Sequence, residues 1–194
     1  NKNEKLPFFG EFFLFLSTMK RIAIDMDDVM ADTTVKIIQY INERVEGNFN
    51  YDSLLNASND EKKAFYELYM SHNSFLWDEG FFEDIPVKPH AVEVIKELME
   101  KYEVFIVSAA TEFPNSMKEK LNWMKKHFPF ISWQHIVFCG HKHMILADYL
   151  IDDHEKNLKT FTGSPLLFTA PHNIHLTEYE RVNSWLDVKK RLLV

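Results

Sequence analysis

Cysteine is nearly absent from this chain, and basic residues are outnumbered by acidic ones. Its 194 residues contain a single cysteine, Cys139, so no disulfide can form within the chain, which favours a reducing, cytoplasmic compartment. Lys and Arg total 22 against 29 Asp and Glu, giving a net charge of −7. This balance disfavours a nucleic-acid polymer or an anionic membrane as the partner, because both reward clustered cations. A small anion that a bound metal neutralises remains compatible with it.

We also expect neither a membrane-spanning segment nor a cleaved signal peptide. Residues 8–16 are largely apolar, but they are too short to cross a bilayer, and no small-residue cleavage site precedes Met19. Because Met19 leads directly into the first strand-like run, we interpret residues 1–18 as an N-terminal extension outside the core. The rest has no internal repeat or long linker, and its length favours one domain with a small insertion.

Apolar strand-like runs alternate with helical patterns after residue 20, which is typical of an α/β fold with a parallel sheet. We predict five core strands at 22–26, 104–107, 134–138, 149–151 and 166–169, and helices at 34–45, 59–71, 89–101, 115–127 and 184–193. Residues 48–85 interrupt the alternation with a polar stretch, one helix and an aromatic cluster. We therefore predict a helical cap at 35–85, inserted into a core formed by 19–34 and 86–194.

Three carboxylates lie within four residues at the end of the first predicted strand. Residues 22–24 are apolar, and Asp25, Asp27 and Asp28 come directly after them. Carboxylates this close repel one another unless a cation lies among them, and an open α/β sheet binds its ligand beyond the carboxyl ends of its strands. The sequence therefore predicts a Mg²⁺ site used for phosphate chemistry.

Each part of a phosphoryl-transfer site has a candidate at a predicted strand end. Asp25 can attack phosphorus as the nucleophile, and Asp27 can act as general acid and base. Ser108 ends the second strand, where its hydroxyl and the following backbone N–H groups, beginning at Ala109, can bind a phosphate oxygen. Lys142 follows the third strand and can balance the crowded acids.

Two further acids, Asp152 and Asp153, end the fourth predicted strand. Adjacent carboxylates at a buried strand end are costly without a cation. We expect one of them to complete the metal shell and the other to orient the metal or the lysine, with an exposed acidic turn as the alternative.

In this order the motifs resemble those of a known superfamily. The runs D-M-D-D-V at 25–29, S-A-A at 108–110, Lys142 and D-Y-L-I-D-D at 148–153 look like the four motifs of the haloacid-dehalogenase-type (HAD) phosphatases. More narrowly, D-M-D-x-V-x-A-D, F-F-x-D-I-P and L-F-T-x-x-H-N-x-H-L are similar to the 5′(3′)-deoxyribonucleotidases. The resemblance extends over residues 20–194.

This resemblance implies an Mg²⁺-dependent phosphatase that cleaves deoxyribonucleoside 5′- or 3′-monophosphates through an aspartyl-phosphate on Asp25. It also implies a five-stranded parallel sheet between helices with a helical cap over the site. The implied metal ligands are the Asp25 carboxylate, the Asp27 main-chain carbonyl and Asp153, with Ser108, Ala109 and Lys142 on the phosphate, and Asp148 and Asp152 in support.

Two positions depart from the family pattern. Asp28 stands where many relatives have glycine, and Thr33 stands where the animal nucleotidases have an aromatic residue that helps to hold the base. Base preference therefore does not transfer. We expect a base pocket formed by Thr33 with the aromatic residues Phe75 and Trp77, although aromatic clusters more often belong to a core.

Several alternatives remain open from the sequence. The enzyme could act on another small phosphomonoester, such as a sugar phosphate, or be a phosphomutase. Two further hypotheses are a signalling receiver domain and a non-catalytic binding protein on the same scaffold. A homodimer is compatible with all of these alternatives. We set aside a zinc site at the His141/His143 and His172/His175 pairs, because neither has metalloprotease spacing and the chain has one cysteine.

Overall fold

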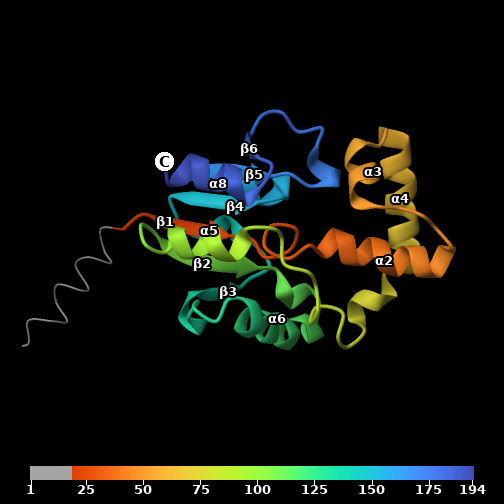
Figure 1. Ribbon diagram of the computed structural model, residues 1–194, viewed down its shortest axis with the longest axis horizontal. Helices are drawn as coiled ribbons and strands as arrows, with labels where there is room; N and C mark the ends of the chain where they lie inside the picture. Colours follow the sequence, from red (N-terminus) through yellow and green to blue (C-terminus); the bar gives the residue numbers. More distant parts are fainter. Residues whose placement is uncertain (1–18) are drawn as a thin grey trace, which may run out of the picture.

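The computed structural model describes residues 19–194, which form a six-stranded sheet with all strands parallel (Figure 1). The expectation for residues 1–18 lies outside the described residues. The sheet order is β3-β2-β1-β4-β5-β6. The strands are β1 (Arg21–Ile24), β2 (Glu103–Ser108), β3 (Ile136–Phe138), β4 (Tyr149–Asp152), β5 (Ser164–Phe168) and β6 (Glu180–Val182). The predicted fold class is confirmed, but the count of five strands was one too low, because β6 is short and largely polar.

The predicted helices are present, and two short ones were missed. The helices are α2 (Thr33–Val45), α3 (Tyr51–Asn56), α4 (Asn59–His72), α5 (Ala91–Leu98), α6 (Pro114–His127), α7 (Glu155–Leu158) and α8 (Trp185–Leu192). Helices α3 and α7 have six and four residues, too few to give a helical hydrophobic period. Capping boxes at Asn50 and Ser58 begin α3 and α4, and the Ser184 side chain caps α8.

Both faces of the sheet are buried, which explains why its strands are apolar without strict alternation. In β1, Ile22 and Ile24 belong to a large core cluster that includes residues of α5, α6 and α8. Ala23 points to the opposite face, where it belongs to a smaller cluster with Leu158 of α7. Successive side chains of a strand point to opposite faces, so β1 contributes to both.

Helices α3 and α4 lie beyond one end of the sheet, next to α2, where the chain leaves β1 (Figure 1). Helix α4 is 14 residues long, yet it has no fully buried residue. The division into a core and a cap at residues 35–85 stays a prediction. Among residues 19–194, no helix combines the length and the apolar character that crossing a membrane requires.

Candidate active site

Three strands deliver the predicted phosphate-chemistry residues to one edge of the sheet. Asp25 directly follows β1, Ser108 ends β2 and is followed by Ala109, and Asp152 ends β4 with Asp153 next to it. Asp25, Asp152 and Asp153 are buried and bring carboxylate oxygens within 4.8 Å of one another. The structure therefore brings together acids from two distant parts of the chain, because β1 and β4 are neighbours in the sheet.

Lys142 lies between two of these acids. It begins a short 3-10 helix (Lys142–Met144), and its buried ammonium is 2.6 Å from Asp25 Oδ1 and 2.6 Å from Asp152 Oδ2. Burial alone would lower the pKa of Lys142, but the two carboxylates outweigh burial and raise it. The lysine therefore carries a positive charge at neutral pH.

Both carboxylate oxygens of Asp152 accept hydrogen bonds. Its carboxylate accepts from Lys142 Nζ, from the His154 backbone N–H at 2.9 Å, and from Asn157 Nδ2 at 3.0 Å. A buried carboxylate with this many donors has no need of a further cation. Asp152 therefore holds Lys142 in place.

Asp153 is different, since its Oδ1 atom is buried and has no hydrogen-bond partner among the described residues. Burial, followed by the charges of Asp25, Asp152 and Asp28, raises the pKa of Asp153 well above its usual value. Burial also raises the pKa of Asp25 to about 7 against the opposing effect of Lys142. An unpartnered oxygen beside a second acid with raised pKa fits a divalent cation, because a cation would supply the missing partner.

Two histidines cover the outer side of Asp153. The rings of His154 and His172 stack with centroids 4.5 Å apart, and their Nε2 atoms lie 3.6 and 3.3 Å from Asp153 Oδ2. These three residues form a second group with potential ligand atoms within 4.8 Å of one another. Removal from water and the nearby His154 lower the pKa of His172 to about 4, so its ring is neutral at pH 7. His172 thus pairs with His154 rather than with His175.

Asp27 contacts a lysine that the sequence reasoning missed. Its Oδ1 accepts from the Thr33 hydroxyl at 3.1 Å, and its Oδ2 bonds to the ammonium of Lys120, which also lies 3.1 Å from Ser108 Oγ. Burial alone would raise the pKa of Asp27, but the charge and hydrogen bond of Lys120 outweigh it, and the pKa is lowered.

The signal for this lysine was present in the helical spacing of α6. Its buried residues include Ser116, Lys120, Trp123 and Met124, which recur at the three- and four-residue intervals of one helix face. A lysine on a core-facing stripe is rare unless it is paired, so its position alone indicates a buried acid nearby.

Asp28 belongs to the start of α2 and not to the cluster of metal-ligand candidates. Its φ angle is 53°, in the left-handed region that favours glycine over residues with a side chain. Its carboxylate accepts from the Thr34 backbone N–H at 2.8 Å and from the Thr34 hydroxyl at 2.5 Å. The third acid of the motif therefore fixes the turn that leads from β1 into α2.

The supporting role predicted for Asp148 is wrong. Asp148 lies at the opposite end of β4, where its Oδ2 accepts from the Arg21 backbone N–H at 2.7 Å. Both residues are exposed and lie where β1 and β4 begin. The run D-Y-L-I-D-D has acids at both ends of one strand, and the sequence alone does not show which end of that strand faces the site.

The predicted base pocket is also wrong. Phe75 is 0% exposed, and its ring packs 5.0 Å from that of Tyr40 and 5.1 Å from that of Phe81. Trp77 is half exposed, and the Thr33 hydroxyl donates to Asp27 instead. These aromatic residues lie in a 3-10 helix (Asn73–Trp77), where neighbouring side chains point in different directions.

Phe75→Ala is expected to lower the free energy of unfolding by roughly 3–5 kcal/mol, because it opens a cavity in the core. Trp77→Ala is expected to cost less than about 1 kcal/mol, since the side chain is half exposed. Urea unfolding of both variants would measure the difference. Equal costs would contradict this assignment of Phe75 to the core.

A different pocket, of about 270 Å³, lies between α2, α3, α4 and the loops after β4 and β5. Its apolar wall includes Ile37, Leu54, Phe65 and Tyr69, and its lining also includes Asp28, His154 and His172. The aromatic residues that α4 contributes to this lining are Phe65, Tyr66 and Tyr69. The volume is near the lower end of the range for small-molecule sites.

Residues 19–194 match the family model described as 5′ nucleotidase, deoxy (pyrimidine), cytosolic type C protein (NT5C). A Staphylococcus epidermidis protein that carries the provisional name 5′(3′)-deoxyribonucleotidase is 43% identical over 176 residues, covering 89% of this chain and 95% of that protein. The 5′(3′)-deoxyribonucleotidase of Bacillus subtilis is 38% identical over 177 residues, covering 90% of this chain and 99% of that protein.

Solved structures show that the fold is that of the HAD hydrolases. A HAD family hydrolase from Deinococcus radiodurans, solved with phosphate and sodium, has a TM-score of 0.56 at 11% identity, covering 90% of this chain and 95% of that one. A provisionally assigned HAD hydrolase from Bacillus subtilis, solved with magnesium, has a TM-score of 0.56 at 11% identity, covering 91% of this chain and 99% of that one. This chain therefore belongs to the NT5C family of 5′ nucleotidases and is a phosphoric monoester hydrolase.

Proposed function

We propose that this enzyme hydrolyses deoxyribonucleoside 5′- or 3′-monophosphates in the cytoplasm, using Mg²⁺ and an aspartyl-phosphate on Asp25. The observation that carries the proposal is the buried acid cluster around Lys142, which lies close to an aromatic-walled pocket. Membership in a nucleotidase family argues against a receiver domain or a non-catalytic binding protein. A homodimer stays a prediction.

The chemistry begins with Asp25, whose carboxylate oxygen attacks phosphorus. A bond forms between this oxygen and phosphorus while the bond from phosphorus to the ester oxygen breaks, and Asp27 gives a proton to the departing oxygen. In the second step a water attacks the phosphorus of the aspartyl-phosphate, and Asp27 takes its proton. The bond between phosphorus and the Asp25 oxygen breaks, inorganic phosphate leaves, and the Asp25 carboxylate is regenerated. The lowered pKa of Asp27 keeps its carboxylate ionised for the second step, whereas the negative charge of a bound phosphate ester would raise that pKa and favour the proton needed in the first.

The remaining side chains bind and orient. Mg²⁺, held by the Asp25 carboxylate, the Asp27 carbonyl and Asp153, would supply positive charge to the phosphate oxygens. Lys142 adds a second positive charge, and Asp152 fixes its direction. Ser108 and the N–H of Ala109 would donate to the phosphate.

The pocket beside α4 favours a nucleoside over a sugar as the leaving group. Phe65 and Tyr69 on its wall offer aromatic faces on which a base can stack, and a base–aromatic stack contributes roughly 1–3 kcal/mol. A sugar phosphate would leave this apolar wall without a partner. The alternatives of a sugar phosphatase and a phosphomutase therefore have no specific observation in their favour.

A substrate panel tests the proposal. We expect dUMP and dTMP to be hydrolysed with a higher kcat/KM than glucose 6-phosphate, because only the nucleotides fill the pocket. Tyr69→Ala is expected to raise KM for the nucleotides roughly 5- to 100-fold, with little change for glycerol phosphate. Trp77→Ala is the matched control, since it removes an aromatic side chain outside the pocket. Preference for sugar phosphates, or a Tyr69→Ala enzyme with unchanged KM, would count against the nucleoside assignment.

A further inference from the structure

Lys120 occupies a buried position between two groups that the proposed reaction uses. It is 2% exposed and projects from the core-facing side of α6. Its ammonium bonds to Asp27 Oδ2, lies 3.1 Å from Ser108 Oγ, and stands 4.9 Å from the centre of the Phe82 ring. An ammonium has three N–H groups, and these three contacts account for them. Lys120 therefore differs from Lys142, which contacts the nucleophile.

The contact with Ser108 decides which way the serine hydroxyl donates. Because a lysine ammonium can only donate, Ser108 Oγ must accept from Lys120. The single hydroxyl proton of Ser108 is then left to donate elsewhere. A hydroxyl that donates is what an anionic phosphate oxygen requires.

The contact with Asp27 completes the support of its carboxylate. Oδ1 accepts from Thr33 and Oδ2 from Lys120, so each oxygen is held by a different element. The neighbouring residue on α6, Glu119, accepts from the backbone N–H groups of Gly80 at 2.6 Å and Phe82 at 2.9 Å. Helix α6 is thus anchored at this point, and the position of the Lys120 ammonium is fixed with it.

The geometry points to Lys120 as a positioning residue that orients Asp27 for proton transfer and keeps the Ser108 hydroxyl directed as a donor to phosphate. The inference rests on the proposed function, because it assigns Asp27 and Ser108 the roles given above. It predicts two separable effects of losing the ammonium: a lower kcat through Asp27 and a higher KM through Ser108.

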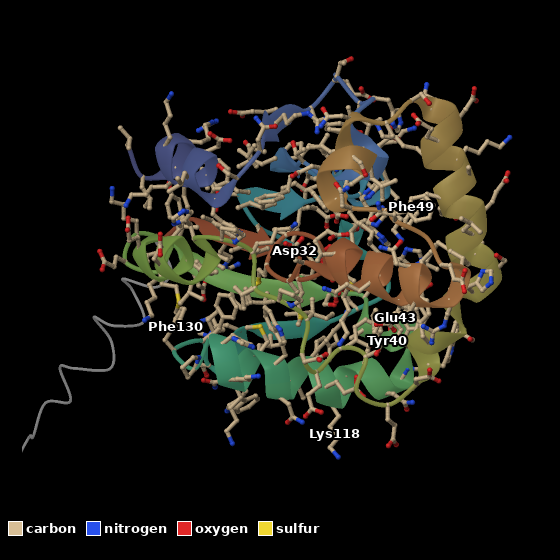
Figure 2. All side chains as sticks on the ribbon, turned by 45° about the vertical axis from the view of Figure 1, so that its right-hand side comes forward. Asp32, Tyr40, Glu43, Phe49, Lys118 and Phe130 are labelled. Carbon is tan, nitrogen blue, oxygen red and sulfur yellow. The ribbon has the colours of Figure 1, made fainter. Side chains whose placement is uncertain are left out.

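Lys120→Met tests this inference, because methionine has a similar length and helix propensity but no donor. With p-nitrophenyl phosphate as substrate, we expect kcat/KM to fall roughly 10- to 100-fold, with both kcat and KM affected. Lys120→Arg keeps the charge and donors and is expected to recover part of the loss. Lys118→Met is the matched control on the same helix, where the side chain points outward from α6 (Figure 2), and its activity should be that of the wild type.

A double-mutant cycle separates positioning from a structural effect. If Lys120 acts through Ser108, the KM change of Lys120→Met combined with Ser108→Ala is smaller than the product of the two single changes. Circular dichroism and urea unfolding confirm that each variant is folded, and Lys120→Gln replaces Lys120→Met if the latter is not. Fully multiplicative changes, or wild-type kinetics in the folded variant, would overturn the inference.

The choice of substrate keeps this test apart from the nucleotide assignment. A wild-type enzyme that hydrolyses p-nitrophenyl phosphate but no deoxynucleotide would refute the proposed substrate, while the comparison at Lys120 would still decide the inference. A wild-type enzyme without activity on any phosphate monoester would refute both.

Discussion

Asp25→Asn is expected to lower turnover by about 10³-fold or more while the protein stays folded. The amide has no anionic oxygen to attack phosphorus, and loss of a covalent nucleophile is among the largest effects of a single substitution. The fold should persist because asparagine has the same shape and keeps an oxygen for the Lys142 ammonium, now 2.6 Å from Asp25. Phosphate release and circular dichroism would measure the two outcomes.

Asp148→Asn provides the matched control for this substitution. It makes the same chemical change at the opposite end of β4, where Asp148 accepts from the Arg21 backbone, and turnover should stay at the wild-type rate. Turnover by Asp25→Asn at a similar rate would show that a different group attacks phosphorus. Removal of the Asp25 charge also relieves its repulsion with Asp152, so we expect no loss of stability.

The acid cluster could be predicted because it follows from topology. Carboxyl ends of parallel strands meet at one edge of a sheet, so acids that end two apolar runs meet if those runs are neighbours. Asp25 and Asp153 satisfy this condition through the pairing of β1 with β4. The strand limits themselves came from apolar runs, and β6 was missed because it has no such run.

The substrate pocket and Lys120 could not be placed by the same reasoning. A helical period shows which residues share a face, but it does not show what that face meets. In α4 the aromatic residues face a pocket, whereas Phe75 of the neighbouring segment faces the core. In the sequence, both segments are aromatic clusters of similar composition, so they cannot be told apart there. For Lys120, the spacing indicates burial, and only the packing of α6 against the site identifies Asp27 and Ser108 as partners.

Removal of the metal is expected to have the second large effect, on activity and on stability together. Chelation with EDTA should abolish phosphate release, and added Mg²⁺ should restore it. Ligand binding to the folded state contributes about 2.7 kcal/mol at a concentration 100 times Kd, which corresponds to a rise in the unfolding temperature of roughly 5 °C or more for a chain of this size. Asp153→Asn should remove most of this rise, because it takes away the charge of the carboxylate whose Oδ1 has no partner. Asp148→Asn is again the control and should keep it.

The pH dependence of this stabilisation follows from the acid cluster. Burial raises the pKa of Asp25 from 3.8 to about 7, so the folded protein binds this proton more tightly than the unfolded chain does. The metal-free protein therefore loses stability as the pH rises from about 4 through about 7, with Asp153 contributing in the same direction. Above that range Asp25 is charged, and a cation offsets its repulsion with the neighbouring acids. The rise in unfolding temperature on adding Mg²⁺ should thus be larger at about pH 8 than at about pH 6, when both are measured against EDTA. An equal rise at both pH values, or one that Asp153→Asn leaves intact, would place the cation outside this cluster.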